Sequence, residues 1–167
     1  MTGDVLRSNG TGDVTLALRR NFRNPDRAKV SFALMPHVTL PTGGTAIGDG
    51  DWSAGMTLPG SIELTKGVLL ELVGEVDAAA DEDRHGRHLA YGGVTGLDID
   101  LTKAIKLTVE TSLMRDNDPQ GHETQALLGL SLAYKVGKNM QFDVGWNGGL
   151  NHDSPDTQLY LGFVQRF

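Results

Sequence analysis

Residues 157–167 read T-Q-L-Y-L-G-F-V-Q-R-F, and they end the chain on an aromatic side chain. Apolar and other residues alternate here, which is the period of a β-strand whose successive side chains point to opposite faces of a sheet. The apolar face is interrupted by Gln165 and otherwise consists of Leu159, Leu161, Phe163 and Phe167. Chain termini usually fray. An apolar strand that runs to the carboxylate therefore predicts a terminal strand held in a sheet.

Eight earlier segments show the same alternation, and none shows a sustained helical period. Most of these segments are long. A tilted strand needs about ten residues to cross a bilayer, whereas strands of soluble sheets most often have about 5–6. Their length therefore favours strands that span a membrane. The sequence predicts an all-β fold, an antiparallel up-and-down transmembrane β-barrel of about nine strands in a single domain over residues 1–167. The eight segments lie within residues 14–18, 30–40, 52–64, 70–78, 91–101, 105–113, 128–136 and 140–146.

The connections between these segments alternate in length. Long polar loops are expected at 41–51, 81–87 and 115–123, short turns at 64–67, 101–104 and 136–139, and an intermediate connection at 151–156. Outer-membrane barrels have long outer loops and short periplasmic turns. The short turns carry Lys66, Lys103 and Lys138, while acidic residues concentrate in the long loops.

Aromatic residues divide between the two ends of the expected strands, as in the two aromatic belts of membrane barrels. The long-loop end has Trp52, Tyr91 and Trp146, and the short-turn end has Phe22, Tyr134, Phe142 and Phe167. The alternative is that these aromatic residues form the core of a soluble β-sandwich.

Composition excludes several classes of protein. Although 39% of the 167 residues are hydrophobic, no apolar run approaches the length of about 18 that a transmembrane helix needs. The absence of cysteine excludes disulfides, thiol catalysis and cysteine-based metal sites. A net charge of -6 argues against nucleic acid as a partner. The first ten residues lack the pattern of a secretory signal peptide.

Charged side chains alternate with the apolar ones, so a barrel with its apolar face towards lipid would direct them into the lumen. Such charges must pair or be hydrated, because an unpaired buried charge is very costly. They either form ion pairs that fill a plugged interior, or line a water-filled path and bias it mildly towards cations. The expected lumen residues are Arg19, His37, Glu71, Glu75, Asp77, Asp98, Lys106, Glu110, Lys135, Asp143 and Arg166.

Catalysis, cofactors and metals are not expected. His85 and His88 lie beside three acidic residues, 81–83, and that set could bind a divalent metal. A hydrated loop is favoured instead, in which divalent cations bridge to lipopolysaccharide. The stretch N-H-D-S-P at 151–155 contains the residue types of a Ser–His–Asp site, but adjacent residues in a turn do not usually reach that geometry.

Two longer stretches carry a family resemblance. G-T-G-D-V-T-L-A-L-R-R at 10–20 is followed by F-A-L-M-P-H-V-T-L-P-T-G at 32–43, and the chain closes with the strand–turn–strand of 144–167. Together they resemble the outer-membrane proteins grouped as the phenol-degradation meta-pathway family. The resemblance implies a location in the bacterial outer membrane and a link to uptake of hydrophobic or aromatic compounds.

The terminal strand also resembles the signal that the barrel-assembly machinery reads, which implies that Tyr160, Gly162 and Phe167 carry it. Gln165 departs from that pattern, where a bulky apolar residue is usual. Nine strands is odd, whereas bacterial barrels are normally even, so we expect a strand upstream of this chain.

The function expected from these features is that of a passive channel or uptake porin for small hydrophobic or aromatic solutes, without covalent chemistry. Its partners would be outer-membrane lipid, lipopolysaccharide and the assembly machinery, and not nucleic acid. Two alternatives stay open: a plugged structural or adhesive barrel, and a soluble β-barrel that binds an apolar ligand.

Overall fold

The computed structural model describes residues 10–23, 29–44 and 47–166. These residues form ten strands and no helix long and apolar enough to cross a membrane. The strands are β1 (Val14–Ala17), β2 (Arg20–Arg23), β3 (Val30–Leu40), β4 (Ser53–Thr65), β5 (Val68–Ala80), β6 (Arg87–Asp100), β7 (Ile105–Asp118), β8 (Gly121–Val136), β9 (Met140–Gly149) and β10 (Thr157–Gln165).

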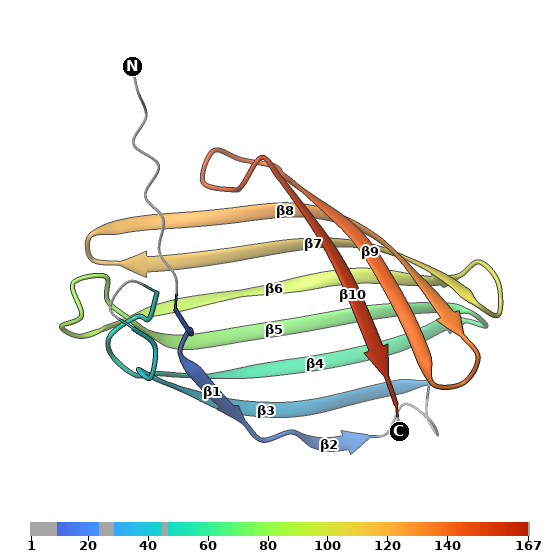
Figure 1. Cartoon of the computed structure of the whole chain (residues 1–167), viewed down its shortest axis with the longest axis horizontal. Coiled ribbons are helices and arrows are strands. Elements are labelled where there is room, and N and C mark those ends of the chain that lie inside the picture. Colours follow the sequence, from blue (N-terminus) through green and yellow to red (C-terminus); the bar gives the residue numbers. More distant parts are fainter. Residues whose placement is uncertain (1–9, 24–28, 45–46, 167) are drawn as a thin grey trace.

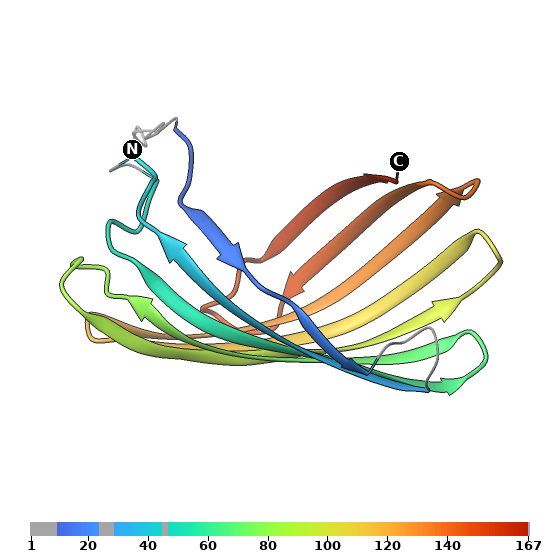
Figure 2. The same ribbon diagram turned by 90° about the horizontal axis from the view of Figure 1, so that it is seen from below.

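The strands form one antiparallel sheet in which each strand from β3 to β10 pairs with the next along the chain, while β1 and β2 both pair with β3 (Figure 1). This confirms the predicted all-β, up-and-down architecture. The sheet curls into a deep trough, and within the described residues β1 and β10 are its two edges, with no ladder joining them (Figure 2).

The first predicted strand is divided into β1 and β2. Both pair with β3, and Ala17 opposite His37 and Arg20 opposite Leu34 belong to one continuous register. The break falls opposite Pro36, which has no N–H to donate to the ladder. The sheet is therefore nine strands wide, as the alternation predicts.

The predicted long loop at 115–123 is wrong. Strand β7 continues to Asp118 and β8 starts at Gly121, so only Pro119 and Gln120 form the connection. Pairs such as Asp116 with Glu123 extend the hairpin. A backbone ladder depends little on side-chain polarity, so the polar composition that favours a loop is equally compatible with a hairpin surrounded by water.

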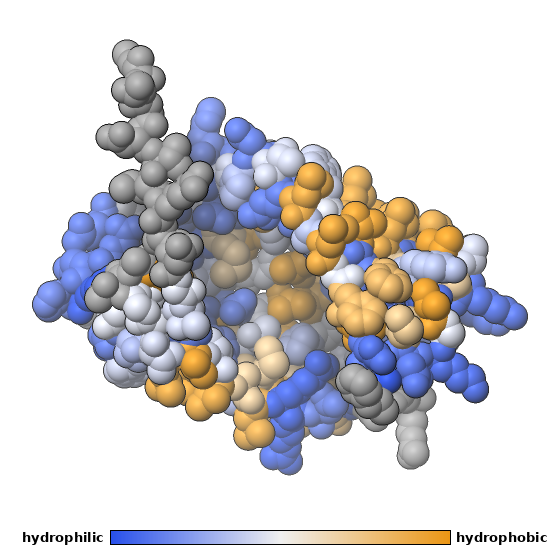
Figure 3. Space-filling view, in the orientation of Figure 1, coloured by the Kyte–Doolittle hydropathy of each residue, from blue (hydrophilic) through white to orange (hydrophobic). Residues whose placement is uncertain are grey.

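The two faces of the sheet differ sharply in character. Large apolar side chains cover the convex face, where Leu159 and Leu161 are among the most exposed residues, at 76% and 87%. Within the described residues, Ala33 alone is a buried hydrophobic residue. Figure 3 shows apolar side chains gathered over β9 and β10 beside a hollowed centre. The fold thus places its apolar surface outside and its polar alternate positions inside the curl.

Candidate binding face and loop rim

The antiparallel register arranges concave-face side chains in rows that cross the strands. The central row joins Pro59 of β4, Val73 of β5, Val94 of β6, Ser112 of β7 and Leu127 of β8. Four of these five residues are apolar. We call this set the apolar row, and it offers a nonpolar contact surface inside the curl.

Charged side chains lie on the short-turn side of the apolar row. Nζ of Lys106 lies 2.6 Å from Oδ2 of Asp98, and the hydroxyl of Thr108 donates to Oδ1 of the same carboxylate at 2.5 Å. Asp98 is buried, so this ion pair offsets the cost of taking its charge out of water. Glu71 and Glu110 lie one row closer to the apolar row, aligned through Gly96.

A second polar group lies on the long-loop side. Nε2 of His37 is 2.9 Å from Oδ1 of Asp77. Glu75 lies two residues before Asp77 in β5, so its side chain is on the same concave face. A Cβ at Gly55 would lie 1.6 Å from that Asp77 oxygen, so only glycine leaves room for the pair. The ligand atoms of His37, Glu75 and Asp77 fall within 4.8 Å of one another, and this set could hold a metal ion.

The remaining expected lumen residues lie on the same face, Arg19 near one edge of the sheet and Lys135, Asp143 and Arg166 near the other. Arg19 donates to Asn21 at 3.0 Å and lines a hollow shared with Glu71, near one edge of the sheet. Lys135 and Arg166 line another hollow near the opposite edge. Asp143 accepts a 2.8 Å hydrogen bond from Gln141. The structure brings the predicted residues onto one face but divides them into separate groups, and their role in selectivity stays a prediction.

The three residues of the expected assembly signal differ in their surroundings. The ring of Tyr160 lies over Gly145, where a Cβ would come within 2.1 Å of it. Gly162 pairs with Asp143 across the β9–β10 ladder. Phe167 lies outside the described residues.

At the long-loop end, Asp13 holds the β3–β4 loop against the start of β1. Its carboxylate accepts hydrogen bonds from the backbone N–H of Gly43 at 2.6 Å and of Asp49 at 2.7 Å. The N–H of Val14 donates to Oγ1 of Thr42 at 2.9 Å. The bonds from Asp49 and Gly43 hold the pKa of Asp13 below its usual value.

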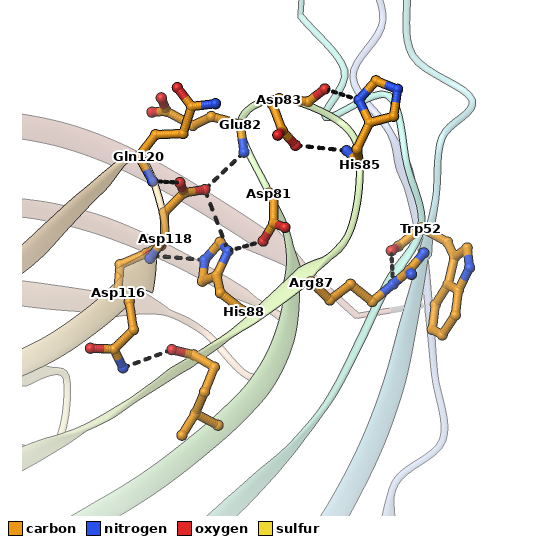
Figure 4. Close-up of polar contacts among 12 residues, drawn as sticks. Trp52, Asp81, Glu82, Asp83, His85, Arg87, His88, Asp116, Asp118 and Gln120 are labelled. Carbon is orange, nitrogen blue, oxygen red and sulfur yellow. Dashed lines mark hydrogen bonds and ion pairs between the residues drawn. The ribbon is translucent and has the colours of Figure 1, made fainter.

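The same loop is fixed a second time at its end. The guanidinium of Arg87 lies 3.7 Å from the ring centroid of Trp52 and donates to the carbonyl oxygen of Trp52 at 2.9 Å. It also forms an ion pair of 2.8 Å with Asp51. Arg87 begins β6, so this contact joins the β3–β4 loop to the β5–β6 loop (Figure 4).

Three carboxylates surround the imidazole of His88 at this rim (Figure 4). Its Nδ1 lies 2.9 Å from Asp81 and 3.4 Å from Asp118, and its Nε2 lies 2.7 Å from Asp116. We call these four residues the rim cluster. Asp118 also accepts from the backbone N–H groups of Gln120 and Glu82, which hold its pKa below the usual value.

The β9–β10 loop folds back onto β8. Oγ of Ser154 accepts from the N–H of Ala126 at 2.7 Å. Its hydroxyl has two acceptors within reach, the Ala126 carbonyl oxygen at 2.9 Å and Oδ1 of Asn151. The N–H of Thr124 donates to Asp153 at 2.9 Å. These contacts engage the Ser154 hydroxyl with backbone and with Asn151, so it has a structural role in this loop.

Several residues that organise this rim cannot be recognised from the sequence. Asp13 and Ser154 bond to backbone 30 and 28 residues away, and no local pattern indicates such a partner. His88 and the acidic residues 81–83 are recognisable as a candidate metal set from the sequence, together with His85. In the structure His85 instead bonds within its own loop to Asp83. Asp118 was missed as a ligand candidate because its stretch was expected to be a loop.

Comparison with known proteins supports the resemblance seen in the sequence. The family described as "Putative MetA-pathway of phenol degradation" matches residues 3–167. No curated protein matches the chain.

Proposed function

This chain belongs to the phenol-degradation MetA-pathway family, and on that premise we propose that it is an outer-membrane β-barrel that lets small hydrophobic or aromatic molecules pass unchanged. The observation that carries the proposal is the sidedness of the sheet. Apolar side chains cover its convex face, and the concave face carries charged side chains, some of them in ion pairs, with an apolar row between them. That is the arrangement of a barrel with lipid outside and water inside.

Closure is part of the proposal. In lipid an unpaired strand edge is not tolerated. Each backbone N–H or C=O group without a hydrogen-bond partner costs several kcal/mol there, because no water can replace the partner. The edges β1 and β10 must therefore be paired when the protein spans a membrane. The pairing partner completes the cylinder around the concave face.

The apolar row supports the choice of solute. An aromatic ring can contact Val73, Val94 and Leu127 while its polar substituents face the carboxylates above and below. Glu71, Glu75 and Glu110 form no ion pair with any described residue, so they leave the path negative and favour cations over anions. No chemical step is required of any residue.

Solute preference is tested in proteoliposomes by osmotic swelling. Phenyl glucoside and methyl glucoside share a sugar that does not cross lipid unaided, and they differ in one ring. We expect the bulkier phenyl glucoside to enter at least as fast as the methyl compound. Entry governed by size alone, with the methyl compound faster, would contradict an aromatic preference.

The channel itself is tested in planar bilayers. Ion current from the refolded protein supports an open path, and a lack of current would favour the second candidate, a plugged barrel. That candidate has a specific observation behind it, because the Lys106–Asp98 and His37–Asp77 pairs bridge neighbouring strands inside the curl. A folded monomer in plain buffer would overturn both and support a soluble protein that binds an apolar ligand.

A further inference from the structure

The rim cluster has the composition of a metal site. Asp81 comes from the β5–β6 loop, His88 from β6 and Asp118 from the end of β7, yet one ligand atom of each lies within 4.8 Å of the others. The residues are 7 to 37 positions apart in the sequence. Only the β5–β6–β7 register brings them together.

The imidazole of His88 lies between carboxylates on both sides of its ring. The side chain of His88 is only 6% exposed, and its Nε2 is buried without a hydrogen-bond partner among the described residues. Nε2 does lie 2.7 Å from Oδ1 of Asp116, but the approach is not that of a hydrogen bond. A buried ring nitrogen without a partner is costly, and a carboxylate beside it is in the position from which it can orient a metal-bound imidazole. The other ring nitrogen, Nδ1, faces Asp81 and Asp118.

Charge points the same way. Asp81, Asp116 and Asp118 together carry three negative charges when ionised, and His88 can offset one of them at most. Glu82 and Glu123 lie close by in the sequence and in the β7–β8 register, and they add to the negative charge. A divalent cation would neutralise the excess that remains.

We propose that Asp81, His88 and Asp118 bind a divalent transition-metal ion, of which Zn²⁺ and Ni²⁺ are the matching class. One imidazole nitrogen with two carboxylates suits these ions, whereas Ca²⁺ and Mg²⁺ prefer ligand sets made only of oxygen. His88 coordinates through Nδ1, the nitrogen that faces both carboxylates. Asp118 keeps its two backbone hydrogen bonds, since a carboxylate has lone pairs for both tasks.

Asp116 is the positioning residue of this site. Its carboxylate lies at Nε2, on the far side of the ring from the metal ligands, and a small rotation lets it accept the Nε2–H bond. Carboxylates in this position fix the orientation of metal-bound imidazoles. The side chain of Asp116 is about half exposed, at 47%, whereas those of Asp81, His88 and Asp118 are only 10%, 6% and 7% exposed.

A bound ion would join the β5–β6 loop to the β7–β8 hairpin at the mouth of the curl. In this structure the loop and the hairpin are joined by the 2.8 Å hydrogen bond from the N–H of Glu82 to Asp118. The metal would add a crosslink at the same place. Solute entry and metal binding would then meet at one rim, although the metal site does not depend on the proposed transport.

The test uses tag-free, refolded full-length protein, so that no added histidines compete. Zn²⁺ and Ni²⁺ binding is measured by calorimetry, and Co²⁺ is used as a probe whose absorption reports its ligands. We expect one Zn²⁺ per chain, and no comparable binding of Ca²⁺ or Mg²⁺. The variant Asp116→Asn should weaken Zn²⁺ binding about 10- to 100-fold, as loss of an outer partner does.

Variants separate the site from other candidates. His88→Gln should abolish Zn²⁺ binding, and Asp81→Asn serves as a second ligand variant should that protein not fold. His85→Gln, in the same loop but outside the cluster, should bind Zn²⁺ as the parent does. The proposal would be overturned if Zn²⁺ binding were lost in His37→Gln instead, or if His88→Gln bound Zn²⁺ as tightly as the parent. It would also be overturned if the protein bound Ca²⁺ as tightly as Zn²⁺.

Discussion

The backbone N–H of Gly43 donates a 2.6 Å hydrogen bond to Oδ1 of Asp13, across 30 residues of sequence. These two residues belong to the G-D-V and L-P-T-G stretches in which the family resemblance is seen. A Cβ at Gly43 or Gly48 would come within 2.7 Å of the same oxygen, so both positions need glycine for the loop to close around Asp13. The two short motifs are therefore two halves of one junction between β1 and the β3–β4 loop.

Replacing Asp13 with asparagine should loosen the β3–β4 loop. The amide keeps one acceptor oxygen, but it loses the charge and one of the two acceptors that bind Gly43 and Asp49. We expect faster amide hydrogen exchange at Gly43, Asp49 and their neighbours, measured by mass spectrometry. Asp49→Asn is the matched control, because Asp49 contributes its backbone N–H to the junction.

Acid should loosen the same loop in the parent protein. The pKa of Asp13 is lowered on folding, so its contribution to stability is complete above the unfolded value of 3.8 and is lost as the pH falls through the lower folded value. Hydrogen exchange at the loop, corrected for its intrinsic pH dependence, should rise only below about pH 4. A release that begins near pH 6 would show that another group controls the loop.

Replacing Ser154 with alanine should destabilise the β9–β10 connection. The buried hydroxyl accepts the bond from the N–H of Ala126, whose carbonyl oxygen also accepts from the N–H of Leu150. The change therefore leaves the N–H of Ala126 without its partner, and a buried group left unpaired costs about 1–3 kcal/mol. The loss should appear as a lower free energy of unfolding in urea from lipid vesicles. His152→Ala, an exposed change two residues earlier, should leave that free energy nearly unchanged.

Replacing Lys106 with methionine should destabilise the sheet at the short-turn side. Met keeps the shape of the side chain but leaves the buried Asp98 without its 2.6 Å ion pair, at an expected cost of about 1–3 kcal/mol. The double variant with Asp98→Asn should recover part of the loss in the same urea titration. Lys135→Met, on the same face but exposed, is the control, and an equal loss there would rule out a specific role for the pair.

Replacing Val94 with asparagine should weaken the aromatic preference that we propose for the solute path. Loss of apolar contact costs about 0.8 kcal/mol per methylene, which is about a fourfold change in binding. The ratio of phenyl glucoside to methyl glucoside entry should fall, while the ion conductance stays the same. Thr95→Asn changes the neighbouring position on the convex face, and a similar fall there would place the contact outside the apolar row.

The strands and their faces could be predicted from the sequence because both are local properties. A period of two assigns each residue to one of the two faces of the sheet. Glu71 and Leu72 are therefore placed on opposite faces by their neighbours in the sequence alone. The contacts at the rim could not be predicted in this way. Asp118 meets His88 because β6 and β7 share a register, and Ser154 meets Ala126 because a loop folds back over β8.

The error at 115–123 has the same origin. Polar residues such as Asp116 and Glu123 occur in loops and also in hairpins that extend into water, and their composition does not distinguish the two. The ladder from Arg115 opposite Thr124 to Asp118 opposite Gly121 decides the matter. This extension of β7 is also what brings Asp118 within 3.4 Å of His88.

By itself, the sequence determined the strands, their order and the apolar character of the outer face, because alternation and turn residues act over a few positions. The tertiary structure alone decided which side chains meet: Asp13 with Gly43, Lys106 with Asp98, and His88 with three carboxylates. The physical reason is that such partners are set by the register between strands. Register depends on the whole backbone ladder and on the turns that connect it, and it is not encoded at any one position.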